Sequence, residues 1–406
     1  MNMTDVSNIS GVDRYMEVLV EGLSQCRELS VTWLKFVHDR KMIFMRENQR
    51  NGYKEILIPL PQLISNLVSQ PFWMKQYCRV NYHLLEKHFV DKEHCILHLH
   101  TFNLIDFALY VKERISCKIV SHIHCIPWKS AYNSNTQAFN RMYKLYYLDK
   151  DYNQPHRLVY RSYEQTLYTQ SDSIVCVSYS SKEFINRMQG NNLNISVVYN
   201  GIKSPKRYFS LKKESESSVV KCLYVGALSA SKGLDAILRS LQIVVARGYK
   251  VSLTVVGKCF PQQTAHYYQE YPDVPLEFKG LIGFEELQEI YRQSNIGLIA
   301  SLQEQCSYAA IEMMMFGLPV ISTAVDALEE MFVFGRNALK VPTVFSEVTG
   351  LSVDIQCMAN QIITLVKAPS LRRKMGQNSY KRYCQLFTLD KMISETLTIY
   401  HNQIHT

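Results

Sequence analysis

The strongest constraint on the fold is a repeated alternation between short apolar, β-branched segments and longer segments with the hydrophobic period of an α-helix. Such alternation is typical of parallel sheets whose two faces are covered by helices. The sequence therefore predicts an α/β protein with Rossmann-like, doubly wound parallel sheets. The strand-like segments are Cys95–Leu99, Lys118–Ile123, Ser173–Ser178 and Ile195–Tyr199 in the first half, and Lys221–Val225, Val251–Val256, Ile296–Ala300 and Pro319–Thr323 in the second.

The best domain boundary lies between the two sets of strands. Asn200–Gly201 is a turn signal, and a polar run follows it at residues 212–218. A last helix in residues 381–406 is expected to cross back to the first domain. The predicted organisation is an N-terminal domain over 1–203 with a helical insertion near 128–170, a C-terminal domain over 204–380, and the final helical segment over 381–406.

Positive charge is spread evenly along the chain. Of 406 residues, 45 are Lys or Arg and 36 are Asp or Glu, which gives a net charge of +9. Nucleic-acid-binding proteins usually concentrate such charge in a stripe or tail, so we expect no nucleic-acid partner. The even charge fits better with phosphates of a substrate or weak contact with an anionic membrane surface.

Cysteine usage and hydropathy place further limits. The eleven cysteines are scattered singly without a C-x-x-C pair, which is typical of reduced thiols in a cytosolic protein. The apolar runs are far shorter than the roughly 18 residues that a membrane-spanning helix needs, and no secretory leader pattern is present at the start. We therefore expect a cytoplasmic protein, with contact at the inner face of the membrane as a further option.

Each half contains a glycine-bearing turn that leads into an amphipathic helix. Gly11 precedes one apolar stripe, and Gly226 and Gly233 precede another. Either turn could hold a phosphate at the helix N-terminus, or could simply let a strand turn into a helix. Neither matches G-x-G-x-x-G, so a dinucleotide-dependent oxidoreductase has weak support.

The first predicted strand has a defect. Only ten residues precede Gly11, and five of the nine from Met1 to Ile9 are polar. Either this strand is stunted or the chain begins inside it, and a chain extended at that end should then be more stable.

The segment from Ile296 to Pro319 carries the most chemical information, because a buried strand ends there in a polar loop and a short helix follows. Glu304 lies in the loop, and Glu312 lies among apolar residues of the helix. A buried carboxylate is costly unless donors bind it, and the vicinal hydroxyls of a ribose are suitable donors. The backbone N–H groups at the helix start would suit a diphosphate, and they belong to Cys306, Ser307 and Tyr308.

With these motifs the chain resembles the retaining, nucleotide-sugar-dependent glycosyltransferases of the GT-B fold, and most closely glycosyltransferase family 4. The resemblance covers nearly the whole chain and rests on five motifs in the family's order. These are SGVDRY at 10–15, SDSIVCVS at 171–178, Asn200–Gly201–Ile202, LYVGALSASKGLD at 223–235, and Glu304-x7-Glu312 followed by EMMMFGLPVIST.

The resemblance implies roles for individual residues. Glu304 would contact hydroxyls of the donor sugar, and Glu312 would hold the nucleotide ribose. Lys232 would bind the diphosphate and stabilise it as it leaves, and His124 would lie near the donor sugar. The glycine turns at Gly11 and Gly226 would lie near the diphosphate. One departure is Ala227, where many relatives have an arginine that supplies a second positive charge.

The resemblance also implies a reaction. Two Rossmann-like domains facing a central cleft would transfer a sugar from a nucleotide-diphosphate sugar to an acceptor hydroxyl, with retention and without a metal or other cofactor. The acceptor would be a glycan or a lipid-linked molecule in polysaccharide or glycoconjugate synthesis. A GT-B epimerase or phosphorylase, or a non-catalytic module that binds sugar nucleotides, are the alternatives.

Three other patterns can be explained either by a purely structural role or by a functional one. His98 with His100 and His122 with His124 form H-x-H pairs on neighbouring strand ends, which could bind a metal but fit hydrogen-bonded core histidines better. Asp149 and Asp151 form a D-x-D pattern that we interpret as a solvated turn. The tyrosine-rich stretch from Trp128 to Ser171 is either a helical hairpin or an acceptor surface.

Overall fold

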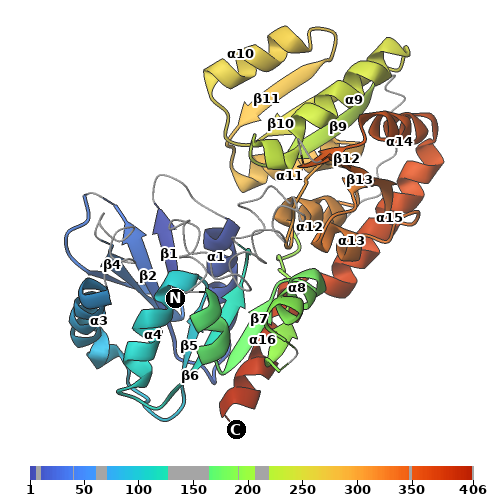
Figure 1. Ribbon diagram of the computed structural model, residues 1–406. Helices are drawn as coiled ribbons and strands as arrows, with labels where there is room; N and C mark the ends of the chain where they lie inside the picture. The colour runs from blue at the N-terminus through green and yellow to red at the C-terminus, as the bar shows by residue number, and fades with distance from the viewer. Residues whose placement is uncertain are drawn as a thin grey trace. The chain divides into compact units, whose positions relative to one another are not determined.

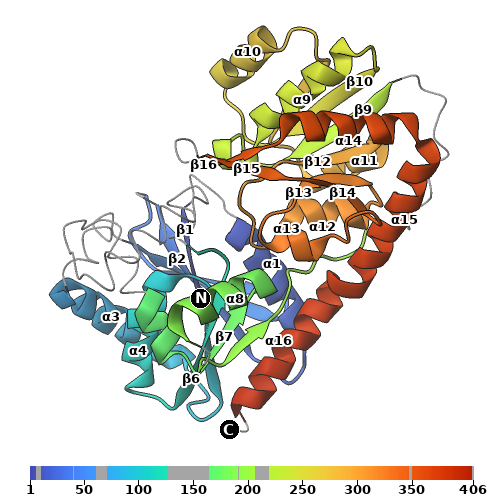
Figure 2. The same ribbon diagram turned by 45° about the vertical axis from the view of Figure 1, so that its right-hand side comes forward.

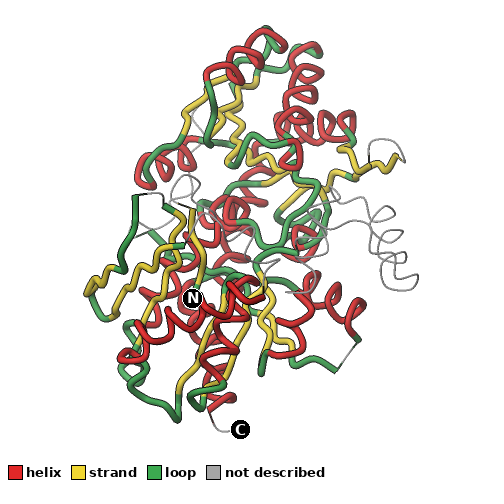
Figure 3. The backbone as a smooth tube through the Cα atoms, turned by 60° about the vertical axis from the view of Figure 1, so that its left-hand side comes forward, coloured by secondary structure: helices red, strands yellow, loops and turns green. Residues whose placement is uncertain are grey.

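The computed structural model describes residues 1–5, 11–39, 41–60, 71–126, 164–190, 192–205, 219–346 and 350–404. These residues form two compact units (Figure 1). Among the described residues, the first unit contains 1–126, 164–200 and the chain from Leu389 onward, and the second runs from Gly201 to Thr388. In each unit, strands lie between helices (Figure 3), which confirms the predicted α/β class.

The first unit contains two four-stranded sheets, in the orders β1-β2-β4-β3 and β5-β6-β7-β8, and only β3 runs antiparallel to its neighbour. Met1 joins the two sheets: its amino group donates to the carbonyl of His98 at 2.5 Å, and its own carbonyl accepts from the N–H of His100 at 2.9 Å. The strands are β1 (Asn2–Asp5), β2 (Val31–His38), β3 (Arg46–Arg50), β4 (Tyr53–Pro59), β5 (Cys95–Leu99), β6 (Cys117–Ile123), β7 (Ser173–Cys176) and β8 (Ile195–Val197).

Helices cover these sheets. The last of them, α16, packs against α1 (Figure 2). The two helices are so close that a Cβ on Gly22 would come within 2.5 Å of Ile393. The helices of this unit are α1 (Gly11–Leu23), α3 (Pro71–Leu85), α4 (Ile105–Lys112), α8 (Tyr179–Gln189) and α16 (Leu389–Ile404), with 3₁₀ turns at Glu86–His88 and Phe102–Leu104.

The second unit has a six-stranded, all-parallel sheet in the order β11-β10-β9-β12-β13-β14 and a separate antiparallel hairpin, β15-β16. Its strands are β9 (Val220–Val225), β10 (Val251–Val256), β11 (Leu276–Gly280), β12 (Ile296–Ile299), β13 (Val320–Thr323), β14 (Ala338–Val341), β15 (Thr343–Ser346) and β16 (Gly350–Val353). Its helices are η3 (Ala230–Lys232), α9 (Leu234–Ala246), α10 (Pro261–Glu270), α11 (Phe284–Gln293), α12 (Tyr308–Met315), α13 (Ala327–Met331), α14 (Ile355–Lys367) and α15 (Pro369–Leu386).

All eight strands expected from the sequence are present, with ends that shift by one or two residues. The end of the chain contains two helices, α15 and α16, which are separated at Phe387 and Thr388. The predicted domain limits, at 203/204 and 380/381, remain predictions. All eleven cysteines are free thiols. Within the described residues, no helix is both long and apolar enough to cross a bilayer.

The polar character of β1 has a structural explanation. Asn2 is fully buried, and its side chain accepts from the indole N–H of Trp33 at 2.7 Å and donates to the carboxylate of Asp13 at 3.2 Å. Thr4 donates to the same carboxylate at 2.5 Å. Buried polar groups are tolerated when they are hydrogen-bonded in this way, so this strand does not need apolar side chains.

The strand is nevertheless short. Its pairing with β2 begins at Asn2 opposite Lys35, and the preceding residues of β2 instead line a cavity of about 500 Å³. The first residues of β5, Cys95 to Leu97, line the same cavity. Burial lowers the pKa of the Met1 amino group beside it to about 5. The cavity therefore lies between the first residues of β2 and those of β5, next to the buried amino group of Met1.

Four β-branched residues added in front of Met1 are expected to raise the melting temperature by a few degrees. The added segment would pair with β2 and β5, bury apolar surface and carry the amino group out of the interior. Differential scanning calorimetry measures the shift. A Gly-Pro-Gly-Pro extension of equal length is the control, because proline cannot donate to the sheet. Equal melting temperatures for both extensions would contradict the interpretation of this cavity.

Candidate active site

Lys232 and Glu304 meet at the carboxyl ends of two neighbouring strands of the second unit. Lys232 ends the 3₁₀ turn after β9, and Glu304 lies in the loop after β12. The two loops are tied together by a hydrogen bond from the N–H of Leu302 to the carbonyl of Ser231 at 2.8 Å. As a result, the Lys232 Nζ lies 2.5 Å from the Glu304 Oε2. The sequence named both residues, and the structure brings them into one ion pair.

Gly233 makes this approach possible. Its φ is +72°, a left-handed conformation that glycine adopts without strain. A Cβ at this position would lie 2.2 Å from the carbonyl oxygen of Ala300, which is backbone and cannot move aside cheaply. Only glycine therefore lets the β9 turn pack against the end of β12 and place Lys232 beside Glu304.

Asp326 holds the loop that carries Glu304. Its carboxylate accepts from the Glu304 N–H at 3.2 Å, and the N–H of Ala327 donates to the Glu304 carbonyl at 3.1 Å. Asp326 is the sole non-glycine residue with positive φ, 46°, in the described part of the chain. Such strain concentrates at functional sites. Sequence reasoning missed Asp326, because its backbone conformation leaves no spacing signal in an unaligned chain.

Glu312 lies inside α12 and is 1% exposed. Its Oε2 accepts from the hydroxyl of Tyr291 at 2.7 Å, and the Tyr291 ring stacks on Phe316 at 5.1 Å between ring centroids. The carboxylate predicted to bind a ribose thus has a protein donor already. Tyr291 was not predicted, because it lies in α11 and only the fold brings α11 against α12.

The three residues predicted at the start of α12 have distinct environments. Ser307 is the N-cap, and its hydroxyl accepts from the N–H of Ala310 at 3.3 Å. Cys306 and Ser307 are both buried, whereas Tyr308 is half-buried and begins the helix. The Ser307 hydroxyl is therefore used to cap the helix, and the backbone N–H groups remain the candidates for a diphosphate.

Gly226 lies directly after β9, and its N–H donates to the carbonyl of Val256 at 2.9 Å. A Cβ on Gly257 would come within 1.9 Å of the Gly226 carbonyl, so these two strand ends are in close contact. Ala227, which follows, accepts a 2.6 Å hydrogen bond from the Tyr224 hydroxyl. Ala227 has no charged side chain, and the positive charge beside Glu304 is that of Lys232.

In the first unit, four imidazole rings gather at the ends of β5 and β6. The His100 Nδ1 lies 2.9 Å from the His124 Nε2, and the His98 Nε2 lies 3.3 Å from the His122 Nδ1. His98 also contacts the hydroxyl of Tyr400 at 2.6 Å. This confirms that the two H-x-H pairs share one face. Gly11 is the exposed first residue of α1, with room for a Cβ.

Burial lowers the pKa of all four histidines below 6.5, and that of His124 to about 3. Each ring is therefore neutral near pH 7 and able to accept one hydrogen bond. Nitrogen atoms of His98, His100 and His122 lie within 4.8 Å of one another, close enough to hold a metal ion after small shifts. No carboxylate belongs to this trio.

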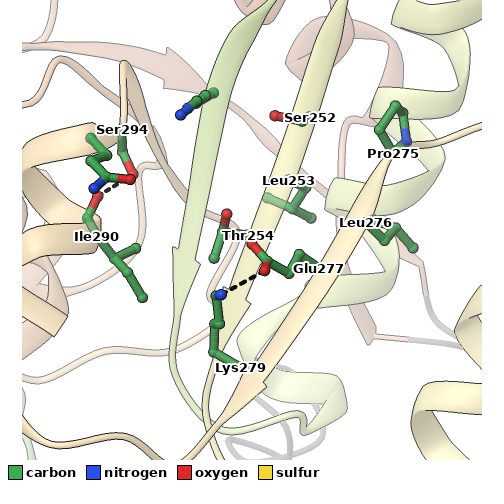
Figure 4. A pocket seen from close by; sticks show the side chains of 11 residues that line it. Ser252, Leu253, Thr254, Pro275, Leu276, Glu277, Lys279, Ile290 and Ser294 are labelled. Atoms are coloured by element: carbon green, nitrogen blue, oxygen red, sulfur yellow. Dashed lines mark hydrogen bonds and ion pairs between the residues drawn. The ribbon is translucent and has the colours of Figure 1, made fainter. Parts of the chain in front are cut away.

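A cavity of about 290 Å³ lies elsewhere in the second unit, beside β10, β11 and α11 (Figure 4). It contains an ion pair between Lys279 and Glu277 at 2.5 Å. Its lining includes none of the predicted site residues, and it lies away from the carboxyl ends of the strands, where α/β sheets bind ligands. Asp149, Asp151 and most of the tyrosine-rich stretch lie outside the described residues.

Comparison with known proteins agrees with this geometry. A family described as Glycosyltransferase Family 4 matches residues 9–204, and one described as Glycosyl transferases group 1 matches residues 220–367. The chain therefore belongs to the glycosyltransferases of family 4 and group 1 type.

Two solved structures superpose on nearly the whole chain. The sucrose-phosphate synthase of Thermosynechococcus elongatus does so with a TM-score of 0.73 and 17% identity, over 100% of this chain and 98% of that one. The Anabaena protein HepE in complex with UDP has a TM-score of 0.66 and 13% identity over 99% of each chain. These likenesses identify the fold as GT-B, with two Rossmann-like domains.

The match to curated sequences is partial. The capsular polysaccharide biosynthesis glycosyltransferase CapM of Staphylococcus aureus is 25% identical over 183 residues, which are 44% of this chain and 45% of that protein. The chain spans about 45 to 64% of the length of the first curated relatives that it matches.

Proposed function

We propose that this protein is a retaining glycosyltransferase that moves a sugar, of the hexose type, from a nucleotide-diphosphate sugar to an acceptor hydroxyl. The observation that carries the proposal is the Lys232–Glu304 pair at the carboxyl ends of β9 and β12. An ammonium and a carboxylate in such a place have the chemistry needed for a diphosphate and for sugar hydroxyls, respectively. The acceptor is proposed to be a glycan or a lipid-linked molecule in polysaccharide or glycoconjugate synthesis.

The residues would act as follows. The bond between the anomeric carbon and the phosphate oxygen breaks, and negative charge grows on the diphosphate, where Lys232 stabilises it. The acceptor oxygen bonds to the anomeric carbon on the same face, and its proton passes to the leaving phosphate oxygen. Glu304 accepts hydrogen bonds from sugar hydroxyls, and Glu312 with Tyr291 accommodates the ribose. His124, neutral at pH 7, is proposed to contact the donor sugar.

The ion pair also predicts how donor binding begins. In their ion pair Lys232 and Glu304 neutralise each other, and the side chains are 33% and 11% exposed. An arriving diphosphate must share the ammonium with the carboxylate, which frees Glu304 oxygens for the sugar. Binding of the diphosphate and of the sugar should therefore be coupled.

Nucleoside diphosphates are expected to raise the melting temperature more than the matching monophosphates. UDP is the first to test, because HepE was solved with UDP. A ligand that binds only the folded protein stabilises it by about 2.7 kcal/mol at a hundred times its Kd. UMP and uridine are the controls, since they lack the phosphate that Lys232 would hold. Equal shifts for UDP and uridine would contradict a diphosphate site.

Transfer is proposed to need no metal, and the same experiments test this. Activity and UDP binding after dialysis against EDTA should equal those of the untreated protein. Retention is tested by NMR of the product, whose anomeric configuration must match that of the donor.

We further propose that the protein works in the cytoplasm, at the inner face of the membrane.

A further inference from the structure

The ring of His124 contacts three side chains of the first unit. His124 lies directly after β6 and is half-buried. The ring of His122 is parallel to it, at 4.5 Å between centroids and 5° between planes, and the ring of Tyr15 meets it edge-on at 4.5 Å. The third contact is polar, because the His100 Nδ1 lies 2.9 Å from the His124 Nε2.

The contact with His100 differs in kind from the other two. Ring contacts tolerate rotation of a ring within its own plane, whereas a hydrogen bond requires its donor and acceptor to face each other. Among the described residues, the contact with His100 is the only hydrogen bond of the His124 ring, and it occupies Nε2. The other nitrogen, Nδ1, is therefore the one that can contact a ligand.

His100 is a firmly held support for this contact. Its side chain is buried, and its backbone N–H donates to the carbonyl of Met1 at 2.9 Å. The hydroxyl of the next residue, Thr101, accepts from the N–H of Met3 at 3.1 Å. These two bonds tie the end of β5 to β1, so the His100 ring reaches His124 from a fixed stretch of backbone.

One proton lies between the two rings. Burial lowers the pKa of His100 and His124 below 6.5, so near pH 7 each ring carries a single proton. If the His124 Nε2–H donates to the His100 Nδ1, both rings keep their proton on Nε2, which is the preferred nitrogen of neutral histidine in water. The reverse order would place both protons on Nδ1. In the favoured order the His124 Nδ1 is bare and can accept a hydrogen bond.

We propose that His100 is a positioning residue of the transfer reaction. Its Nδ1 accepts the Nε2–H of His124, which fixes that ring and leaves the His124 Nδ1 to accept a hydrogen bond from a hydroxyl of the donor sugar. The inference rests on the proposed function, in which His124 contacts this sugar. His98, in the same H-x-H pair, has different partners: its Nδ1 contacts the Tyr400 hydroxyl at 2.6 Å, and its Nε2 contacts His122 at 3.3 Å.

NMR of the full chain with ¹⁵N-labelled histidine tests the tautomer without any substrate. Two-bond ¹H–¹⁵N correlation spectra distinguish a protonated ring nitrogen from a bare one. We expect a protonated Nε2 and a bare Nδ1 for His124, whose signals are identified by their loss in His124→Gln. A protonated Nδ1 on this residue would overturn the proposal.

Two substitutions of His100 separate positioning from packing. His100→Asn places an amide oxygen near the position of Nδ1, where it can accept the His124 Nε2–H, whereas His100→Phe fills the space without an acceptor. We expect H100N to keep the His124 tautomer and H100F to show a mixture of both. With UDP-glucose as the probe donor, H100F should lower kcat about tenfold or more and change KM less than about threefold, because a misplaced group costs most in the transition state. H100N should recover most of the lost kcat.

His98→Phe is the matched control. His98 and His100 are 8% and 5% exposed, and each forms a hydrogen bond through its ring, so both phenylalanine variants should lose stability to a similar extent in urea titrations. H98F should nevertheless keep kcat within about twofold, because the His98 ring does not hydrogen-bond to His124. Equal losses of kcat in the two variants, or an H100F variant with unchanged kcat and tautomer, would refute a positioning role.

The proposed function and this inference fail in different ways. A protein that neither releases UDP from UDP-glucose nor is stabilised by UDP would contradict the proposed function, and the tautomer of His124 would still decide the state of the histidine pair. H100F should remain stabilised by UDP, because the diphosphate contact is assigned to Lys232. Loss of UDP stabilisation in H100F would show that the substitution disturbs more than His124, and would count against the inference.

Discussion

Replacement of Lys232 by alanine is expected to reduce kcat/KM for sugar transfer at least about a hundredfold. In the proposed reaction its ammonium faces the phosphate oxygens whose charge grows as the glycosidic bond breaks, and loss of one such group typically costs 10² to 10³ in rate. Stabilisation by UDP should be lost in the same variant. Radiolabelled sugar transfer and thermal shift measure the two effects.

The chain offers a closely matched control in Lys279. It lies in the same unit, its side chain is also 33% exposed, and its ion pair with Glu277 has the same 2.5 Å length (Figure 4). Lys279→Ala should therefore leave transfer and UDP binding unchanged. If both alanine variants lost the same activity, Lys232 would have a general electrostatic effect and no special role at the site.

Glu304→Gln separates the two members of the pair. The amide keeps the size of the side chain but removes its charge, so the hydrogen bonds to sugar hydroxyls weaken. We expect transfer to fall about a hundredfold while UDP alone still binds, since Lys232 is then free of its carboxylate. A variant that transfers sugar normally would contradict the role of Glu304.

Acid is expected to destabilise the first unit strongly. In the folded chain burial keeps the pKa of His98, His100, His122 and His124 below the ordinary 6.5. The unfolded chain takes up protons at these residues below about pH 6.5, and the folded chain does not, so stability is present above that pH and lost as the pH falls. For His124, whose pKa in the folded chain is about 3, the loss amounts to about 1.4 kcal/mol per pH unit below pH 6.5.

Between pH 7.5 and 5.5 His124 alone should therefore remove about 1.4 kcal/mol from the free energy of unfolding, and the other three histidines should act in the same direction. Urea titrations at a series of pH values measure it, with the buried Trp33 reporting on the first unit. His122→Phe should lower the slope of stability against pH. A slope near zero would show that the imidazoles are accessible to protons in the folded state.

Local pattern was enough to predict a large part of the fold. The eight predicted strands are short and largely apolar, and six of them are internal strands of their sheets, so their burial explains why the hydrophobic signal is so clear. Seven further strands of the described residues were not predicted, namely β2, β3, β4, β11, β14, β15 and β16. Two of these, β3 and β11, are edge strands that contain several exposed, charged residues. Two others, β2 and β4, contain charged or polar side chains among their apolar ones. The hydrophobic signal of these four strands is therefore weaker.

The candidate site divides in the same way. Lys232, Glu304 and Glu312 were named from a strand, a glycine turn and a spacing, all of which are local. Asp326 and Tyr291 were not predicted. Asp326 contacts Glu304 and Tyr291 contacts Glu312, and in each pair the two residues are more than 20 positions apart in the sequence. No periodicity in a single chain carries that information.

By itself, the sequence determined the class of the fold, eight of its strands and the residues that we propose bind a diphosphate and a sugar. These features depend on hydrophobic periodicity and residue chemistry, which can be read from short segments of the sequence. Only the tertiary structure decided that Gly233 lets Lys232 reach Glu304, that buried hydrogen bonds satisfy the polar β1, and that four histidines share one face. The physical reason is that such contacts arise from backbone approach and packing between distant segments, where distances of a few tenths of an ångström decide what can meet.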